Sequence, residues 1–166
     1  MEQLALRYVE RFATTEGKLV DYLMRKRRER GWAGEGPPDV AGLAARIVAL
    51  GYIDDRAYAE AKAASLARRG MGARRVRQAL QAARVGEDDH AAIAPQVAEA
   101  ARDAALAFAR RRRIGPFGDG QADRAMREKQ FAAMMRAGHD SALSRRILSA
   151  EPGDMLDGDD DGGGDP

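Results

Sequence analysis

The chain repeats Ala5-Leu6-Arg7-Tyr8-Val9-Glu10-Arg11 as Ala105-Leu106-Ala107-Phe108-Ala109-Arg110-Arg111, in the shared pattern Ala-Leu-x-aromatic-x-x-Arg. At the same offset of 100 residues, Arg46-Ile47-Val48 returns as Arg146-Ile147-Leu148. A looser third copy of the first pattern is Ala63-Ala64-Ser65-Leu66-Ala67-Arg68-Arg69. The apolar residues in these copies have helical spacing, and helical units of about 50 residues bury their apolar faces by stacking on copies of themselves. The repeat therefore predicts tandem helical modules.

Glycine, proline and helix-capping residues divide the rest of the sequence into about nine helical stretches. Asp39 and Asp54 are predicted N-caps, because a short acidic side chain satisfies free amides at a helix start. Pro95 is expected to stand at the beginning of a long Ala-rich helix over residues 95–113, after a break. Helical periodicity predicts that one set of apolar side chains is buried: Leu19, Leu23, Ile47, Val48, Leu66, Val76, Leu80, Phe108, Phe131, Ile147 and Leu148.

The amino-acid composition also favours helices. Ala occurs 34 times, whereas Val, Ile and Thr together occur 14 times, too few to supply the β-branched faces of sheets. The predicted fold is all-α, with three tandem three-helix repeats forming an elongated, curved array and a disordered acidic C-terminal tail. The predicted modules are residues 1–53, 54–98 and 99–150, and the tail is residues 151–166.

Charge is divided unevenly along the chain. The whole sequence has 28 Lys and Arg residues against 26 Asp and Glu residues, but residues 151–166 hold seven acids and no base. Residues 1–150 therefore hold 28 bases and 19 acids, a net charge of +9. The tail has too few apolar side chains to offset the entropy of ordering. It is expected either to compete with a partner for the basic body or to act only as a solubilising appendage.

Sequence signs of an enzyme are absent. The chain lacks cysteine, so it has neither disulfides nor thiolate metal sites, and it lacks the phosphate-binding and nucleophile motifs that involve glycine. His90 and His139 are expected to be surface or loop residues, and the acids at helix starts to be caps. We expect no enzyme activity, cofactor or metal. Because signal-peptide and membrane-spanning patterns are missing, we expect a soluble cytoplasmic protein without a membrane partner.

Clusters of basic residues are the feature most suggestive of function. Guanidinium groups pair with phosphate or carboxylate, so clusters aligned along stacked modules would suit a polyanion or an acidic protein. Solvated helix faces that complement the helix dipole are the alternative. Aromatic residues do not alternate with the bases, and a helix-turn-helix signal over residues 73–84 is weak. The candidate binding residues are Arg25, Lys26, Arg27, Arg28, Arg68, Arg69, Arg74, Arg75, Arg77, Arg110, Arg111, Arg112 and Arg113.

One segment resembles a known family. Gly51-Tyr52-Ile53-Asp54-Asp55-Arg56-Ala57-Tyr58-Ala59, followed by Arg68-Arg69-Gly70-x-Gly72, is similar to the central segment of the RecX family of RecA regulators. The resemblance extends over about residues 3–150, and three further segments look like the alphaproteobacterial branch: residues 5–11, 112–117 and 136–138. Two positions depart from the family pattern. His139 is expected to loosen packing, and Gly17 to cost about 1 kcal/mol of helix propensity relative to Ala.

The resemblance implies a monomeric, non-enzymatic protein of three three-helix repeats that lies in the groove of the RecA filament on DNA. There it would inhibit the recombinase, ATPase and co-protease activities of RecA, and so act in DNA repair, homologous recombination and the SOS response. The basic clusters would contact the RecA filament or DNA phosphate, on single- or double-stranded DNA. A basic helical regulator that binds nucleic acid directly is the alternative.

Overall fold

The computed structural model describes residues 1–32, 34, 36–120 and 122–151. Within these ranges the chain forms helices and no β-strand, as the composition predicts. The elements are α1 (Glu2–Arg11), α2 (Glu16–Arg30), α3 (Val40–Ala49), α4 (Asp55–Arg68), α5 (Ala73–Ala82), α6 (Glu87–Glu99), α7 (Ala101–Arg112), the 3₁₀-helix η1 (Gly115–Phe117), α8 (Arg124–Ala137) and α9 (Ser141–Ser149).

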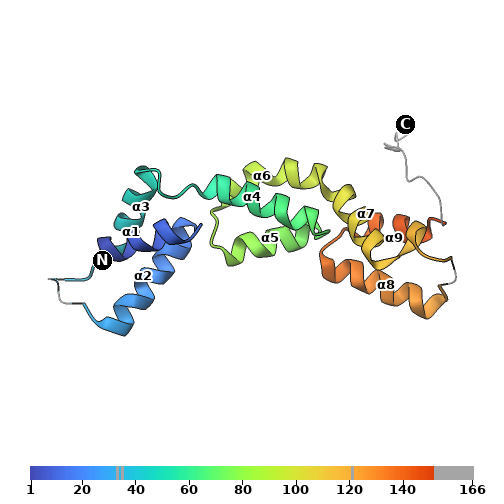
Figure 1. The fold of residues 1–166 in the computed structure, drawn as a ribbon, viewed down its shortest axis with the longest axis horizontal. Helices are drawn as coiled ribbons and strands as arrows, with labels where there is room; N and C mark the ends of the chain where they lie inside the picture. Colours follow the sequence, from blue (N-terminus) through green and yellow to red (C-terminus); the bar gives the residue numbers. More distant parts are fainter. Residues whose placement is uncertain (33, 35, 121, 152–166) are drawn as a thin grey trace, which may run out of the picture.

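Three separate hydrophobic cores organise these helices. The first unites α1 to α3, the second unites α4 to α6, and the third unites α7 to α9; we call these groups module 1, module 2 and module 3. The modules follow one another in an elongated, gently arched row (Figure 1). The fold is therefore the predicted array of three three-helix repeats. The residue boundaries of the modules stay predictions, and the tail predicted for residues 151–166 lies, beyond Glu151, outside the described residues.

The internal repeat corresponds to equivalent positions in the structure. Ala5 and Ala105 are both fully buried in the first helices of modules 1 and 3, where a small side chain lets the neighbouring helix approach closely. Ile47 and Ile147 are 2% and 1% exposed in the third helices. Residues of the looser copy lie in α4, the first helix of module 2. The repeated segments therefore occupy the same structural roles.

Most of the side chains predicted to be buried are buried. Leu19, Leu23 and Ile47 fill the core of module 1, Val76 and Leu80 that of module 2, and Phe108 and Ile147 that of module 3. The other four are half-buried: Val48, Leu66 and Leu148, which pack against the cores of their modules, and Phe131.

The helix predicted over residues 95–113 is wrong. The chain instead forms α6 and α7, which meet at Ala100, and Pro95 lies inside α6. Proline removes one helical hydrogen bond, and here the acceptor left without a partner belongs to Ala91 on the exposed face, where water can replace the lost bond. The penalty is thereby reduced, so Pro95 does not end the helix. The turn at Ala100 links modules 2 and 3 through a single residue.

Aspartates begin several helices, as predicted. Asp39 accepts a hydrogen bond from the Gly42 amide, and Asp54 accepts one from the Ala57 amide, each at 2.8 Å. We expect Asp54→Ala to lower the free energy of unfolding by about 1 kcal/mol, because the α4 amide loses its partner. Chemical denaturation measures this value. Asp54→Asn, which retains a capping oxygen, should retain most of the stability, and an equal loss in both variants would contradict the capping role.

Candidate partner-binding surface

The second helix of each module lies on one long edge of the array. In Figure 1, α2, α5 and α8 form the lower edge of the row. Each of these three helices has a net charge of +3 from its own residues. By contrast, α1 is neutral and α6 carries four acids and no base; among the first and third helices α7 alone also reaches +3. We call the edge formed by α2, α5 and α8 the basic edge.

The structure distributes the thirteen candidate binding residues over four helices. Arg25 to Arg28 lie near the end of α2, and Arg74, Arg75 and Arg77 lie in the first turns of α5, so both groups belong to the basic edge. Arg68 and Arg69 lie at the end of α4, and Arg110 to Arg113 lie at the end of α7. These two helices are the first helices of modules 2 and 3. All thirteen are at least partly exposed. Seven of the thirteen therefore lie on second helices and the other six at the ends of first helices, and a single binding stripe stays a prediction.

In module 3 the sequence analysis missed the bases of the edge. They are Arg124, Arg127, Lys129 and Arg136, all exposed on α8. These residues are spaced along the helix rather than adjacent in the sequence, so they do not form a visible cluster. The signal that finds them is the net charge of equivalent helices, which requires the modules to be aligned first.

Two candidate residues make contacts between modules. The Arg74 guanidinium donates to the Met135 carbonyl, and the Arg111 guanidinium donates to the Arg69 carbonyl. Both bonds join module 2 to module 3. These two side chains therefore have a structural role as well as a positive charge, which the sequence did not reveal.

Among the described residues, most of the candidate bases have no acidic partner. The exceptions are Arg25 and Lys26, which pair with Glu29 at 3.8 and 2.7 Å. Within the part of the chain that the structure describes, no ion pair to an acid is formed by Arg27, Arg28, Arg68, Arg69, Arg75, Arg77 or Arg113. These guanidinium groups can bind phosphate or carboxylate without first giving up an acidic partner.

Aromatic rings lie against some of the bases, although the sequence does not alternate the two types. The Arg110 guanidinium lies 4.9 Å from the centre of the Phe117 ring, and the Arg25 guanidinium lies 5.6 Å from that of Tyr22. A ring restricts a guanidinium group while its in-plane N–H donors remain free. The fold therefore places aromatic rings beside some of the bases, three positions away for Tyr22 and seven for Phe117.

The joint between modules 2 and 3 also includes direct hydrogen bonds between backbones. The Gly72 amide donates to the Ala137 carbonyl at 2.9 Å, and the Arg74 amide donates to the Gly138 carbonyl at 3.1 Å. A side chain on Gly72 would overlap the Gly138 carbonyl, so glycine allows the two backbones to touch. The two modules are therefore in direct backbone contact at this joint.

His139 is part of the same joint: it lies in the loop between α8 and α9, as predicted, but it is buried there rather than on the surface. Its side chain is 5% exposed, its Nε2 lies 3.1 Å from the Gly70 carbonyl, and its ring packs against Phe108. Burial lowers the pKa of His139, which favours the neutral imidazole. The His139 side chain, which departs from the family pattern, therefore fills the joint and does not loosen the packing of module 3.

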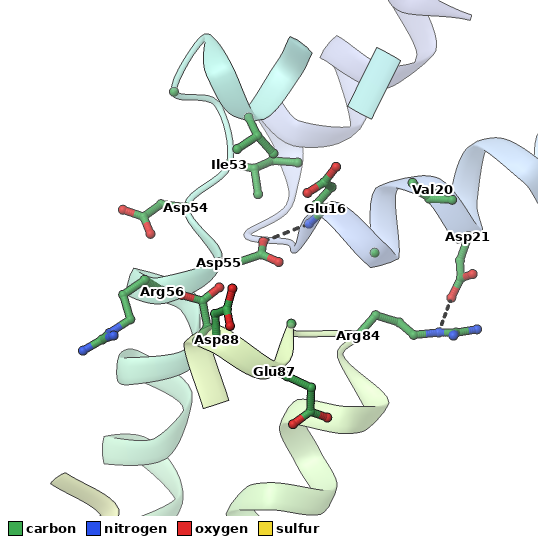
Figure 2. Close-up of a pocket in the computed structure, with 15 residues that line it drawn as sticks. Glu16, Val20, Asp21, Ile53, Asp54, Asp55, Arg56, Arg84, Glu87 and Asp88 are labelled. Atoms are coloured by element: carbon green, nitrogen blue, oxygen red, sulfur yellow. Dashed lines mark hydrogen bonds and ion pairs between the residues drawn. The ribbon is translucent and has the colours of Figure 1, made fainter. Parts of the chain in front are cut away.

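The joint between modules 1 and 2 is built from polar side chains (Figure 2). Asp55 accepts a hydrogen bond from the Glu16 amide at 2.9 Å, and Arg84 pairs with Asp21 at 3.1 Å. A Cβ on Gly17 would lie 2.8 Å from the Arg84 carbonyl oxygen, so glycine permits this close approach. The propensity cost predicted for Gly17 is therefore accompanied by a contact that a larger residue would obstruct.

An acidic cleft of about 920 Å³ opens beside this joint. Its carboxylates include Asp54, the cap of α4, and Glu87 and Asp88 in the first turn of α6, where the helix dipole favours acids. No group of three acidic or histidine side chains suited to a metal ion occurs among the residues that the structure describes. Capping accounts for Asp54, and the position at the start of α6 accounts for Glu87 and Asp88.

Asp55 is expected to make stability depend on pH. Burial raises the pKa of its carboxyl, and the charges of Asp89, Glu16 and Asp54 act in the same direction, against the hydrogen bond from the Glu16 amide. Because the folded pKa exceeds the unfolded one, the contribution of Asp55 to stability is lost as pH rises through the folded value. In Asp55→Asn, thermal unfolding should therefore depend less on pH above about pH 4. Equal pH profiles for Asp55→Asn and the parent would contradict the role of Asp55.

The fold and the surface together define a class: an all-helical protein of three repeats with a basic edge. A family model described as "RecX, second three-helix domain" matches residues 54–92. A solved structure entitled "Crystal structure of regulatory protein RecX" is similar in fold, with a TM-score of 0.62 and 22% identity over 88% of this chain and 68% of that one. No helix in the described part of the chain is long and apolar enough to cross a membrane.

Two curated relatives match most of the sequence. "Regulatory protein RecX" of Myxococcus xanthus is 32% identical over 92% of this chain and 86% of that protein. "Regulatory protein RecX" of Agrobacterium fabrum is 31% identical over 87% of this chain and 79% of that protein. The chain belongs to the RecX family of regulatory proteins.

Proposed function

We propose that the protein binds the RecA nucleoprotein filament and inhibits the recombinase, ATPase and co-protease activities of RecA, acting as a cytoplasmic regulator of DNA repair without enzyme activity of its own. The observation that carries this proposal is the basic edge: three equivalent helices, each of net charge +3, along an elongated array. Family membership supports the regulatory role.

The basic edge suits a long acidic groove formed by protein carboxylates and DNA phosphate. Its guanidinium groups are spread over three modules, so the contacts add along the array, and binding should weaken with salt as counterions are exchanged. The binding residues are those predicted from the sequence, together with Arg124, Arg127, Lys129 and Arg136 of α8. Arg74 and Arg111 contribute through the joint between modules 2 and 3.

The test is the ATPase rate of RecA on single-stranded DNA with increasing amounts of the full chain. Inhibition at substoichiometric amounts is expected, because one elongated molecule in the groove affects several RecA subunits. An unchanged rate at excess protein would overturn the proposal. If binding to naked DNA is as tight as binding to the filament, the alternative of a direct nucleic-acid-binding regulator is favoured instead.

The acidic sequence 151–166 is expected to compete with the partner for the basic body. Its seven acids are attached to a body of charge +9, so they stay at high local concentration near the basic edge. Deleting residues 151–166 should raise the affinity for DNA and for the filament, mostly at low salt, because screening shortens the range of the competition to about 10 Å at 0.1 M. Equilibrium titration at two salt concentrations measures this. Unchanged affinity at both would leave a solubilising role only.

A further inference from the structure

A groove of about 520 Å³ lies on the surface between α8 and α9, the last two helices of module 3. Its sides carry three arginines, Arg124 and Arg127 from α8 and Arg145 from α9. Its apolar lining comes from Phe131 and Leu148, which are both half-buried and so remain partly accessible from the groove. The groove thus combines an apolar surface with guanidinium groups on both helices.

The charge of this groove favours an anionic ligand. Glu128 is the only acid among its described lining residues, and it pairs with Arg124 at 3.1 Å on the surface, where the Arg124 side chain is 93% exposed. Arg127 and Arg145 form no ion pair within the described ranges of the chain. Two guanidinium groups, one on each helix, are therefore free to bind phosphate or carboxylate.

Phe131 and Arg145 favour a ligand with planar groups. The Arg145 guanidinium lies 5.4 Å from the centre of the Phe131 ring, so a ring from one helix and a guanidinium from the other meet in the groove. Nucleic-acid bases stack on both of these groups, and the neighbouring Arg127 can hold a phosphate. An acidic peptide would use the charges but would have no need of the ring. The combination is that of proteins that bind single strands.

We infer that the groove between α8 and α9 binds a single-stranded nucleic acid, with a base against Phe131 and Arg145 and a phosphate on Arg127. The inference deepens the proposed function and rests on it only through Arg127, which belongs to the basic edge; Phe131 and Arg145 are not among the proposed binding residues, and binding to naked nucleic acid is measured without RecA. A paired duplex keeps its bases stacked inside, so it could use only the charges of the groove.

Fluorescence anisotropy of a labelled oligo(dT), titrated with the full chain, tests the inference in the absence of RecA. Phe131→Leu keeps an apolar side chain but removes the ring, and should weaken oligo(dT) binding about tenfold while leaving duplex binding unchanged. Arg145→Gln should weaken binding to oligo(dT) and lower the slope of log affinity against log salt by about 0.7, the value for one single-strand phosphate contact. Arg146→Gln, the exposed neighbour on α9 outside the groove, is the control of equal charge and should bind as the parent does.

Three results would overturn the inference. The first is equal weakening by Arg145→Gln and Arg146→Gln, which would indicate general charge attraction. The second is unchanged oligo(dT) affinity in Phe131→Leu. The third is displacement of oligo(dT) by poly-glutamate as efficiently as by unlabelled oligo(dT), which would indicate an acidic peptide site. Thermal melting confirms folding, and the exposed Arg145 keeps the test valid if Phe131→Leu does not fold.

Discussion

The double variant Arg75→Glu with Arg77→Glu is expected to bind the RecA filament at least about tenfold more weakly than the parent, with stability unchanged. Both side chains are exposed on α5, in the middle of the basic edge, and neither pairs with an acid in the described part of the chain. Reversal turns two attractive contacts into repulsive ones. Because exposed charges contribute little to folding, the loss should concern binding alone. The concentration that halves the RecA ATPase rate measures the effect.

A matched control separates position from net charge. Arg7→Glu with Arg46→Glu makes the same change at exposed sites on α1 and α3, away from the basic edge, and should inhibit RecA nearly as well as the parent. Equal weakening in the two double variants would refute a role for the edge. Arg74 and Arg111 are avoided here, since their bonds between modules 2 and 3 would mix binding with structure.

Gly72→Ala is expected to lower the free energy of unfolding by about 1–3 kcal/mol, the usual cost of overpacking a tight contact. The backbone of Gly72, with φ −77° and ψ 169°, is one that alanine readily adopts, so the effect does not come from local strain. It comes from the new methyl group, which meets the Gly138 carbonyl and lies 2.5 Å from the His139 amide. The bond from the Gly72 amide to Ala137 should weaken with it. Denaturant unfolding measures the loss.

Gly86→Ala provides the comparison. Gly86 stands before α6 as Gly72 stands before α5, with a similar backbone of φ −68° and ψ 159°, but nothing would contact its added methyl group within 4 Å. Its stability should stay within about 0.5 kcal/mol of the parent. Similar losses in Gly72→Ala and Gly86→Ala would mean that both report helix capping and that the joint between modules 2 and 3 tolerates the methyl group.

The fold followed from local rules wherever one residue type decides a local structure. Asp39 and Asp54 cap their helices, and the repeated Ile47 and Ile147 lie in equivalent cores. Pro95 led to a wrong helix boundary. The free-energy cost of proline within a helix depends on whether water reaches the Ala91 carbonyl, and that exposure is a property of the folded chain. In the sequence alone, an exposed and a buried proline look the same, and both predict a helix break.

The binding surface was only partly predictable. Adjacent bases such as Arg25 to Arg28 stand out in the sequence, whereas the spaced bases of α8 become one surface only when equivalent helices line up. His139 and Arg111 act across a joint between residues about 40 to 70 positions apart, and nothing near them in the sequence indicates the partner. Contacts between modules were therefore the part that local patterns could not supply.

The two joints between modules differ in the kind of contact that forms them. Modules 2 and 3 share a backbone contact and the single-residue turn at Ala100, whereas module 1 is held by side chains such as the Arg84–Asp21 pair. Added salt weakens exposed ion pairs and leaves backbone hydrogen bonds largely untouched. Salt therefore reaches only one part of the joint to module 1: the exposed Arg84–Asp21 pair weakens, while the buried hydrogen bond from the Thr15 hydroxyl to the Ala83 carbonyl continues to hold module 1 to module 2.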